Sequence, residues 1–216
     1  MFSLVEKIKS RRGLWSCLLL CLMASIGLSS CATKPVSSSA TENICKLFQE
    51  KPNWYRHAKV SVDKWGGNIH VPMAVMYQES SFKSDARPPM AYLLGFIPQG
   101  RASDAYGYSQ ALKSTWGEYE KAIGKRSADR DNFADAFDFI LWYMDVSQKR
   151  NDVSKWDAYA QYLNYHEGQG GYARGSYKSK QWLLNVAKKV QTRSKRYSSQ
   201  LAQCKAELDS AKKGWF

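Results

Sequence analysis

A run of apolar residues without a polar face constrains the fold of this chain more than any other part of its sequence. Pro72 suits the first turn of a helix, and residues 73–77 (Met-Ala-Val-Met-Tyr) are apolar on every side of that helix. A helix that is apolar all round is stable only where other elements surround it. The sequence therefore predicts a short central helix over residues 72–80 that the rest of the chain buries.

Helical spacing of apolar residues continues through most of the remaining chain. Apolar side chains recur at three- and four-residue intervals, and glycines end several of the segments. The pattern breaks between residues 85 and 105, where prolines bracket an apolar segment that predicts a strand pair or an ordered loop. We therefore expect a mainly α fold with a small irregular or β insertion. The other predicted helices begin at Thr41, Trp54, Thr115, Asn132, Trp156 and Trp182, and a loop over residues 168–175 precedes the last of them.

The first 30 residues have the features of an export signal. Four basic residues precede an apolar stretch over residues 14–26, which is too short for a comfortable membrane-spanning helix. Its end, Leu28-Ser29-Ser30-Cys31, resembles the lipobox of bacterial lipoproteins, in which the cysteine is acylated and becomes the new N-terminus. This resemblance implies a signal peptide over residues 1–30 and a lipid anchor on Cys31. The alternative is a plain signal peptide that is cleaved without acylation.

The segment after Cys31 predicts a tether and then one domain. Residues 31–40 are rich in Ser with one Pro, a composition typical of a flexible linker. Residues 41–216 are enough for one domain with one core. The Ala at position 32 resembles an outer-membrane sorting signal. We therefore expect a protein of the bacterial cell envelope, anchored at the periplasmic face of the outer membrane.

Five cysteines reduce to one pair in the exported chain. Cys17 and Cys21 leave with the signal peptide, and Cys31 takes the lipid. Cys45 and Cys204 remain, and an oxidising compartment favours a disulfide between them. The alternative is two buried thiols.

The positive charge of the chain indicates an acidic partner. The net charge is +13, and removal of residues 1–30 deletes four basic residues and one acidic residue, which leaves +10. Such an excess is typical of proteins that bind nucleic acid, anionic lipid or an acidic polymer. Export argues against nucleic acid, whereas cell-wall glycan carries carboxylates on its lactyl-peptide groups. A merely solvated surface is the alternative.

Glu79 is the candidate catalytic residue. It follows the apolar run directly, so its carboxyl group is expected at the edge of the core, facing a cleft. Partial loss of water raises the pKa of a carboxyl group, and a neutral acid near pH 7 can protonate a glycosidic oxygen. The alternative is an ordinary glutamate on the surface at the end of a helix.

Four short sequence blocks resemble motifs of the lysozyme-like lytic transglycosylases, the goose-type or SLT-domain class, and follow one another in the same order as in that family. They extend over residues 77–170, about half of the chain, and each block is weak alone. The first resembles the Glu-Ser-x-Phe motif of that family, the second its Gly-Leu-Met-Gln and Pro-Ser-Thr-Trp blocks, the third the start of its next helix, and the fourth its Tyr-Asn-Ala-Gly motif. The blocks are Glu79-Ser80-Ser81-Phe82, residues 107–116, Asn132-Phe133-Ala134-Asp135-Ala136 and Tyr165-His166-Glu167-Gly168.

The resemblance implies a peptidoglycan lytic transglycosylase in which one acid serves twice. Glu79 would protonate the oxygen between N-acetylmuramic acid and N-acetylglucosamine and then accept the proton of the muramoyl C6 hydroxyl, which gives a 1,6-anhydro end. The resemblance assigns substrate support to Ser80, sugar binding to Gln110 and orientation of Glu79 to Tyr165. No cofactor is implied, and the histidines show no metal-ligand spacing. The expected partners are peptidoglycan strands, the membrane through the lipid anchor, and cell-wall machinery.

Departures from the family motifs leave two further functions open. Tyr108 and Ser109 replace two apolar residues, which suggests a more polar sugar site, and Glu167 adds a carboxylate. If Glu167 points inward, it would either raise the pKa of Glu79 or hold a water for hydrolysis, and Asp104 is another candidate for holding that water. A chain that holds such a water would be a muramidase. The alternative is that the Glu167 side chain faces solvent. The third hypothesis is a non-catalytic lipoprotein that binds peptidoglycan.

Overall fold

The computed structural model describes residues 35–94 and 96–211. Val36–Phe216 form one compact unit, to which the following description applies. The predicted signal peptide over residues 1–30 and the predicted lipidation site at Cys31 lie outside the described residues. No helix in the described ranges is long and apolar enough to cross a membrane.

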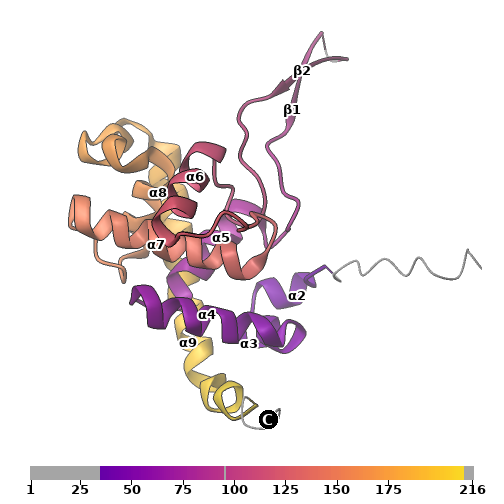
Figure 1. Ribbon diagram of the computed structural model, residues 1–216, viewed down its shortest axis with the longest axis vertical. Coiled ribbons are helices and arrows are strands. Elements are labelled where there is room, and N and C mark those ends of the chain that lie inside the picture. The colour runs from indigo at the N-terminus through magenta and orange to yellow at the C-terminus, as the bar shows by residue number, and fades with distance from the viewer. Residues whose placement is uncertain (1–34, 95, 212–216) are drawn as a thin grey trace, which may run out of the picture. The chain divides into compact units, whose positions relative to one another are not determined.

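The described part of this unit is built almost entirely from helices, with one small antiparallel sheet (Figure 1). This confirms the expected mainly α fold with a β insertion. The elements in chain order are α2 (Ser38–Thr41), α3 (Ile44–Glu50), α4 (Pro52–Trp65), α5 (His70–Ser80), β1 (Met90–Leu93), β2 (Ile97–Arg101), α6 (Lys113–Ile123), α7 (Phe133–Asn151), α8 (Ala158–Ala173), the 3-10 helix η1 (Ser176–Ser179) and α9 (Gln181–Ser210).

Helix α5 is the buried centre of the fold, as its sequence predicts. Residues 71–76 are all buried, and α5 packs against α7, α8 and α9. The helix begins at His70, two residues before Pro72, because the Asn68 side chain receives the backbone N–H of Val71 at 2.8 Å. Since its neighbours surround it, only His70 at its start and its last turn reach the edge of the core.

The folded unit begins earlier than the predicted boundary at residue 41. Residues 38–41 form α2, and Ala40 is fully buried. Ser37 caps this helix by accepting a hydrogen bond from the backbone of Ala40, and its own backbone N–H donates to Glu50 at 3.0 Å. The last residues of the predicted tether therefore belong to the domain. The next helix, predicted to begin at Thr41, begins at Ile44 with Asn43 as its cap.

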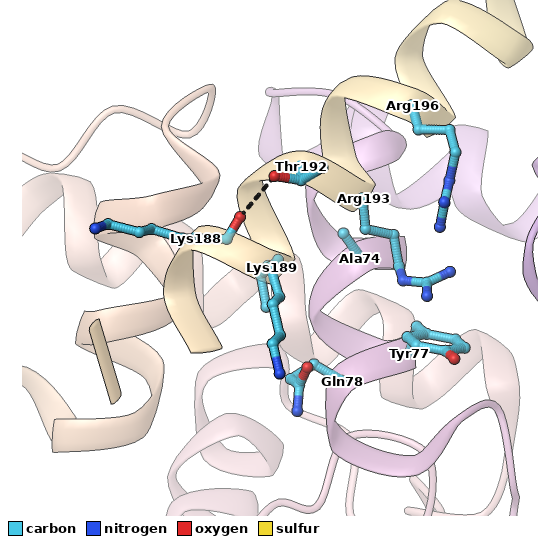
Figure 2. A pocket seen from close by; sticks show the side chains of 9 residues that line it. Ala74, Tyr77, Gln78, Lys188, Lys189, Thr192, Arg193 and Arg196 are labelled. Carbon is cyan, nitrogen blue, oxygen red and sulfur yellow. Dashed lines mark hydrogen bonds between the residues drawn. The ribbon is translucent and has the colours of Figure 1, made fainter. Parts of the chain in front are cut away.

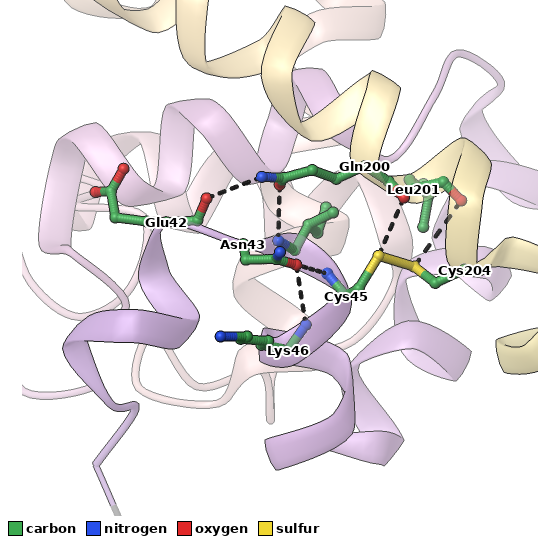
Figure 3. Close-up of a disulfide and its surroundings, with 8 residues drawn as sticks. Glu42, Asn43, Cys45, Lys46, Gln200, Leu201 and Cys204 are labelled. Atoms are coloured by element: carbon green, nitrogen blue, oxygen red, sulfur yellow. Dashed lines mark hydrogen bonds between the residues drawn. A yellow bond between two sulfur atoms is a disulfide. The ribbon is translucent and has the colours of Figure 1, made fainter.

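A disulfide between Cys45 and Cys204 joins α3 to the long terminal helix α9 (Figure 3). Beside it, the Gln200 side chain accepts a hydrogen bond from the backbone of Ile44 and donates one to the backbone of Glu42. The bridge closes a loop over a sequence separation of 159 residues. In the chain-entropy description such a cross-link stabilises the fold by about 5 kcal/mol.

Helix α8 is longer than its sequence predicts. A loop was expected from Gly168 to Gly175, but the helix resumes after a kink at Gly168 (φ 73°, ψ 164°) and continues to Ala173. Glycine adopts this backbone conformation without strain, so one residue redirects the chain without ending the helix. The kink decides where the side chains after Tyr165 lie.

The insertion after α5 forms a hairpin of β1 and β2. The strands pair antiparallel, with Leu93 opposite Ile97 and a register shift between Ala91 and Tyr92. Every residue of both strands is exposed, and Figure 1 shows the hairpin extending away from the helices of the unit. The hairpin therefore covers no part of the core.

Candidate active site

The end of α5 positions Glu79. The helix ends at Ser80, and the next two residues, Ser81 and Phe82, have left-handed backbone angles (φ 52° and 62°) that turn the chain sharply. Phe82 is buried, with its ring centroid 5.9 Å from that of Trp54. Because this aromatic contact anchors the turn, Glu79 stays half-buried at the edge of the core.

Loss of hydration dominates the electrostatics of Glu79. Burial disfavours the ionised form and raises the pKa of Glu79 to about 7, although a hydrogen bond with Tyr162 acts in the opposite direction. The protonated and ionised forms are therefore both well populated at neutral pH. A carboxyl group in this condition can donate a proton and later accept one.

Two tyrosines of α8 lie near Glu79. Tyr162 and Tyr165 are three residues apart, which places them on the same face of the helix. Burial is the main cause that raises the pKa of each hydroxyl, and the charge of Glu79 contributes to both. The structure thus places both Tyr165 and Tyr162 close enough to Glu79 to interact with its charge.

The hydrogen bond to Glu79 comes from Tyr162, which is not among the site residues predicted from the sequence. The hydroxyl of Tyr165, the expected partner, instead donates to the backbone oxygen of Ser109 at 2.6 Å. Tyr165 therefore fastens α8 to the loop over residues 107–111. The signal for Tyr162 was present in the sequence, because a residue one helical turn before a site residue shares its face.

Ser80 is buried beside Glu79, and its hydroxyl donates to the backbone oxygen of Met76 at 3.1 Å. Its hydroxyl hydrogen is therefore used in a hydrogen bond within α5. The hydroxyl oxygen still has acceptor capacity.

Gln110 holds the loop that faces α8. Its side-chain nitrogen donates to the backbone oxygens of Ala86 at 2.8 Å and Gly107 at 2.9 Å, which uses both amide hydrogens. Only the amide oxygen remains as an acceptor. Gly107 is required here, because an added Cβ would lie 2.0 Å from the backbone oxygen of Arg130. The loop is thus fixed by contacts with the backbone.

Tyr108 and Ser109 do not make the sugar site more polar, contrary to expectation. Tyr108 is buried, with its ring centroid 5.5 Å from that of Trp54 and 6.0 Å from that of Phe133. Ser109 is fully buried, and its hydroxyl has no hydrogen-bond partner. Both side chains therefore belong to the core below the loop.

Glu167 takes neither of the two orientations considered from the sequence. It lies within α8 and is almost fully buried, with its carboxylate 2.7 Å and 2.9 Å from Lys180 Nζ. Ser176 and His166 also hydrogen-bond to it. Burial opposes ionisation, but these partners outweigh it and lower the pKa of Glu167 to about 2. Glu167 is therefore an ionised anchor for η1 and α9, and it is not among the groups that shift Glu79.

A hollow of about 400 Å³ lies between α5 and α9, on a side of α5 that presents Ala74, Tyr77 and Gln78 (Figure 2). Glu42 forms ion pairs with two of its arginines. Glu79 lines neither this hollow nor either of two smaller ones. The contacts with α8 therefore define the position of the acid. The α9 residues that line the hollow are Lys188, Lys189, Val190, Thr192, Arg193 and Arg196.

Within the described ranges, no group of three or more His, Cys, Asp or Glu side chains is arranged to hold a metal ion. The family model of the transglycosylase SLT domain matches residues 19–204. The matched range contains Glu79, Gln110, Tyr162 and Tyr165. Searches among curated proteins and among solved structures each found no match.

Proposed function

Because the chain belongs to the transglycosylase SLT domain family, we propose that it is a peptidoglycan lytic transglycosylase with Glu79 as its single acid and base. The observation that carries this proposal is the position of Glu79 at the end of the buried helix α5, hydrogen-bonded to Tyr162, where burial raises its pKa to about 7. An acid that ionises near neutral pH is suited to both proton transfers of the reaction.

In the first step, protonated Glu79 gives its proton to the glycosidic oxygen while the bond from C1 of N-acetylmuramic acid to that oxygen breaks. The N-acetyl group of the same sugar stabilises the positive charge that develops at C1. In the second step, the muramoyl C6 oxygen bonds to C1, and its proton passes to the Glu79 carboxylate. The product is a 1,6-anhydro end, no water is consumed, and Glu79 returns to its protonated state.

Neighbouring polar groups favour the ionised state that Glu79 reaches between the two steps. The Tyr162 hydrogen bond stabilises the carboxylate and lowers its pKa. Tyr165 acts as a positioning residue, since it ties α8 to the carbonyl of Ser109. The free amide oxygen of Gln110 is an acceptor for a sugar N–H or hydroxyl group, and Ser80 offers an acceptor beside the acid.

The lyase reaction is favoured over hydrolysis by the surroundings of the other carboxylates. An inverting hydrolase needs a second carboxylate that holds water beside the sugar. Glu167 is engaged by Lys180, and Asp104 accepts the backbone N–H of Lys113 at 3.2 Å. Glu118 on α6 contributes to the raised pKa of Tyr143, whose ring lies 5.1 Å from that of Tyr165, but it is not among the groups that shift Glu79.

The cellular place of this reaction follows from the N-terminal sequence. We propose that residues 1–30 are removed and that a lipid on Cys31 anchors the protein to the outer membrane, facing the periplasm. The positive charge of the mature chain, +10, suits the carboxylates of the glycan. A globomycin-sensitive shift in the size of the expressed chain, abolished by Cys31→Ser, is the expected result; an unchanged pattern would contradict lipidation.

The test of the proposed reaction is digestion of purified sacculi followed by mass spectrometry of the released fragments. The proposal predicts anhydro ends, which are lighter than reducible ends by one water, and predicts no release by Glu79→Gln. Glu207→Gln makes the same chemical change on an exposed part of α9 and should release fragments normally. Reducible ends alone, or an active Glu79→Gln variant, would refute the proposal.

A further inference from the structure

The exposed apolar side chains of the described residues are concentrated in the hairpin of β1 and β2. Ten large apolar residues are exposed in all, and six of them lie between positions 90 and 97. Leu94 and Phe96 at its tip are 77% and 71% exposed, the highest values of the ten. A cluster of this kind on a soluble unit marks an interaction surface.

Both faces of the hairpin are apolar. Successive residues of a strand point to opposite faces. Leu93 pairs with Ile97 and Tyr92 pairs with Pro98, so an exposed apolar pair lies on each face. A surface that docks onto one partner protein needs one apolar face and leaves the other polar. Apolar groups on both faces suit immersion in an apolar medium that surrounds the tip.

Charged side chains lie only where the hairpin joins the domain. Residues 88–100 contain no Asp, Glu, Lys or Arg, and the first charges on either side are Arg87 and Arg101. Both arginines are exposed. The guanidinium of Arg87 lies 4.3 Å from the ring centroid of Tyr106, and Arg101 donates to the backbone oxygen of Pro88. Two fixed cations thus mark the base of an uncharged apolar projection.

We propose that this hairpin inserts its tip into the interface of an anionic lipid bilayer. The apolar side chains at the tip would enter the boundary between headgroups and acyl chains, and Arg87 and Arg101 would lie at the level of the phosphates. A four-residue strand is about 13 Å long, which is enough to reach through the headgroup layer. The unpaired backbone groups at the outer edges of the two strands prevent deeper entry into hydrocarbon.

Two other roles for the hairpin agree less well with its residues. A wall of a glycan groove would need polar groups for sugar hydroxyls, and Gln99 is the only amide side chain between residues 88 and 100. A cover for the core is excluded, since all residues of both strands are exposed. The hairpin would instead fix the orientation of the domain on a membrane.

Vesicle cosedimentation of residues 36–216 tests the proposal without the lipid anchor. This part of the chain is one compact unit that contains the disulfide and all core residues of the described ranges, so we expect it to fold without residues 1–35. We expect it to bind vesicles of phosphatidylglycerol and phosphatidylethanolamine more tightly than vesicles of phosphatidylcholine. The double variant Leu94→Ser/Phe96→Ser should bind at least tenfold more weakly, with an unchanged melting temperature because both side chains are exposed.

Two further variants separate the contributions of apolar area and charge. Val60→Ser/Trp156→Ser removes exposed apolar side chains outside the hairpin and should bind as the unmodified chain does. Arg87→Gln should weaken binding to the anionic vesicles about fivefold and leave binding to phosphatidylcholine unchanged.

Three results would overturn the proposal. They are no binding by the unmodified chain, equal binding by Leu94→Ser/Phe96→Ser, and an equal loss in the Val60→Ser/Trp156→Ser variant. Loss of self-association in Leu94→Ser/Phe96→Ser with vesicle binding retained would assign the hairpin to a protein contact instead. None of these outcomes depends on the activity of Glu79.

Discussion

Replacement of Tyr162 by Phe tests how the protein sets the pKa of its acid. The hydrogen bond from Tyr162 stabilises the carboxylate of Glu79 and lowers its pKa, against the larger effect of burial. Phe keeps the aromatic ring in place and removes only the hydroxyl. The pKa of Glu79 should therefore rise in the Tyr162→Phe variant.

The size of this rise follows from the energy of one hydrogen bond to a charged group. Such a bond contributes about 1.5–3 kcal/mol, and one pKa unit corresponds to about 1.4 kcal/mol. We expect the pKa of Glu79 to rise by about one to two units from its value of about 7. Because the first step needs protonated Glu79, the fall in rate on the alkaline side should move upward by the same amount.

The assay is the rate of fragment release from sacculi as a function of pH, together with a carbon-13 titration of the Glu79 carboxyl group. Tyr159→Phe makes the same change one turn earlier on α8, at a tyrosine that does not affect Glu79, and serves as the control. An alkaline limb that stays in place or moves to lower pH in Tyr162→Phe would refute the reasoning, as would an equal shift in Tyr159→Phe.

Three other changes have outcomes that the structure fixes. The pKa of Glu79 lies above its unfolded value, so its burial costs stability as pH rises from about 4.5 to about 7. Glu79→Gln should therefore be more stable than the unmodified chain by up to about 3 kcal/mol at pH 8 and equally stable at pH 4. Equal stability at pH 8 would contradict the burial of the acid. Cys204→Ser removes the bridge to Cys45 and should lower the melting temperature by roughly 10–15 °C under oxidising conditions, with no difference under reducing conditions. An unchanged melting temperature under oxidising conditions would exclude the disulfide. The ion pair with Lys180 lowers the pKa of Glu167, so its contribution to folding stability is present at neutral pH and lost as pH falls from about 4.5 to about 2. Glu167→Gln should lower stability at pH 7 and leave the alkaline limb of the pH–rate profile in place. A displaced limb would assign Glu167 to the catalytic site.

The sequence predicts the core of this fold well, because its signal is local. Residues 73–77 are apolar on every side, and such a helix has no stable place except the centre. Glu79 follows from the same argument, since it is the first acid after the buried run. The disulfide prediction needed only the count of cysteines that lie outside the predicted signal peptide and lipidation site.

The missing parts of the site depend on contacts between elements far apart in the chain. Gln110 has the chemistry of a sugar ligand, but nothing in its local sequence shows that Ala86 and Gly107 occupy its amide hydrogens. Glu167 meets Lys180 only because α8 continues beyond the kink at Gly168, where the sequence predicts a loop.

The hairpin shows a different limit. Its prolines and apolar residues predict a strand pair or a loop, and the structure selects the strand pair. Whether apolar residues cover a core or face outward depends on what lies beneath them. No periodicity in residues 92–97 carries that information, and only the three-dimensional arrangement gives the outward orientation.

The central claim is that Glu79 alone passes one proton out and back while the sugar closes on its own hydroxyl. Digestion of sacculi in water enriched in oxygen-18 tests this claim most directly, because hydrolysis places a solvent oxygen on C1 and ring closure does not. We expect fragment ends that carry no label and are lighter than reducible ends by one water. Ends labelled with oxygen-18 at C1 would show that water is the nucleophile and would contradict the account.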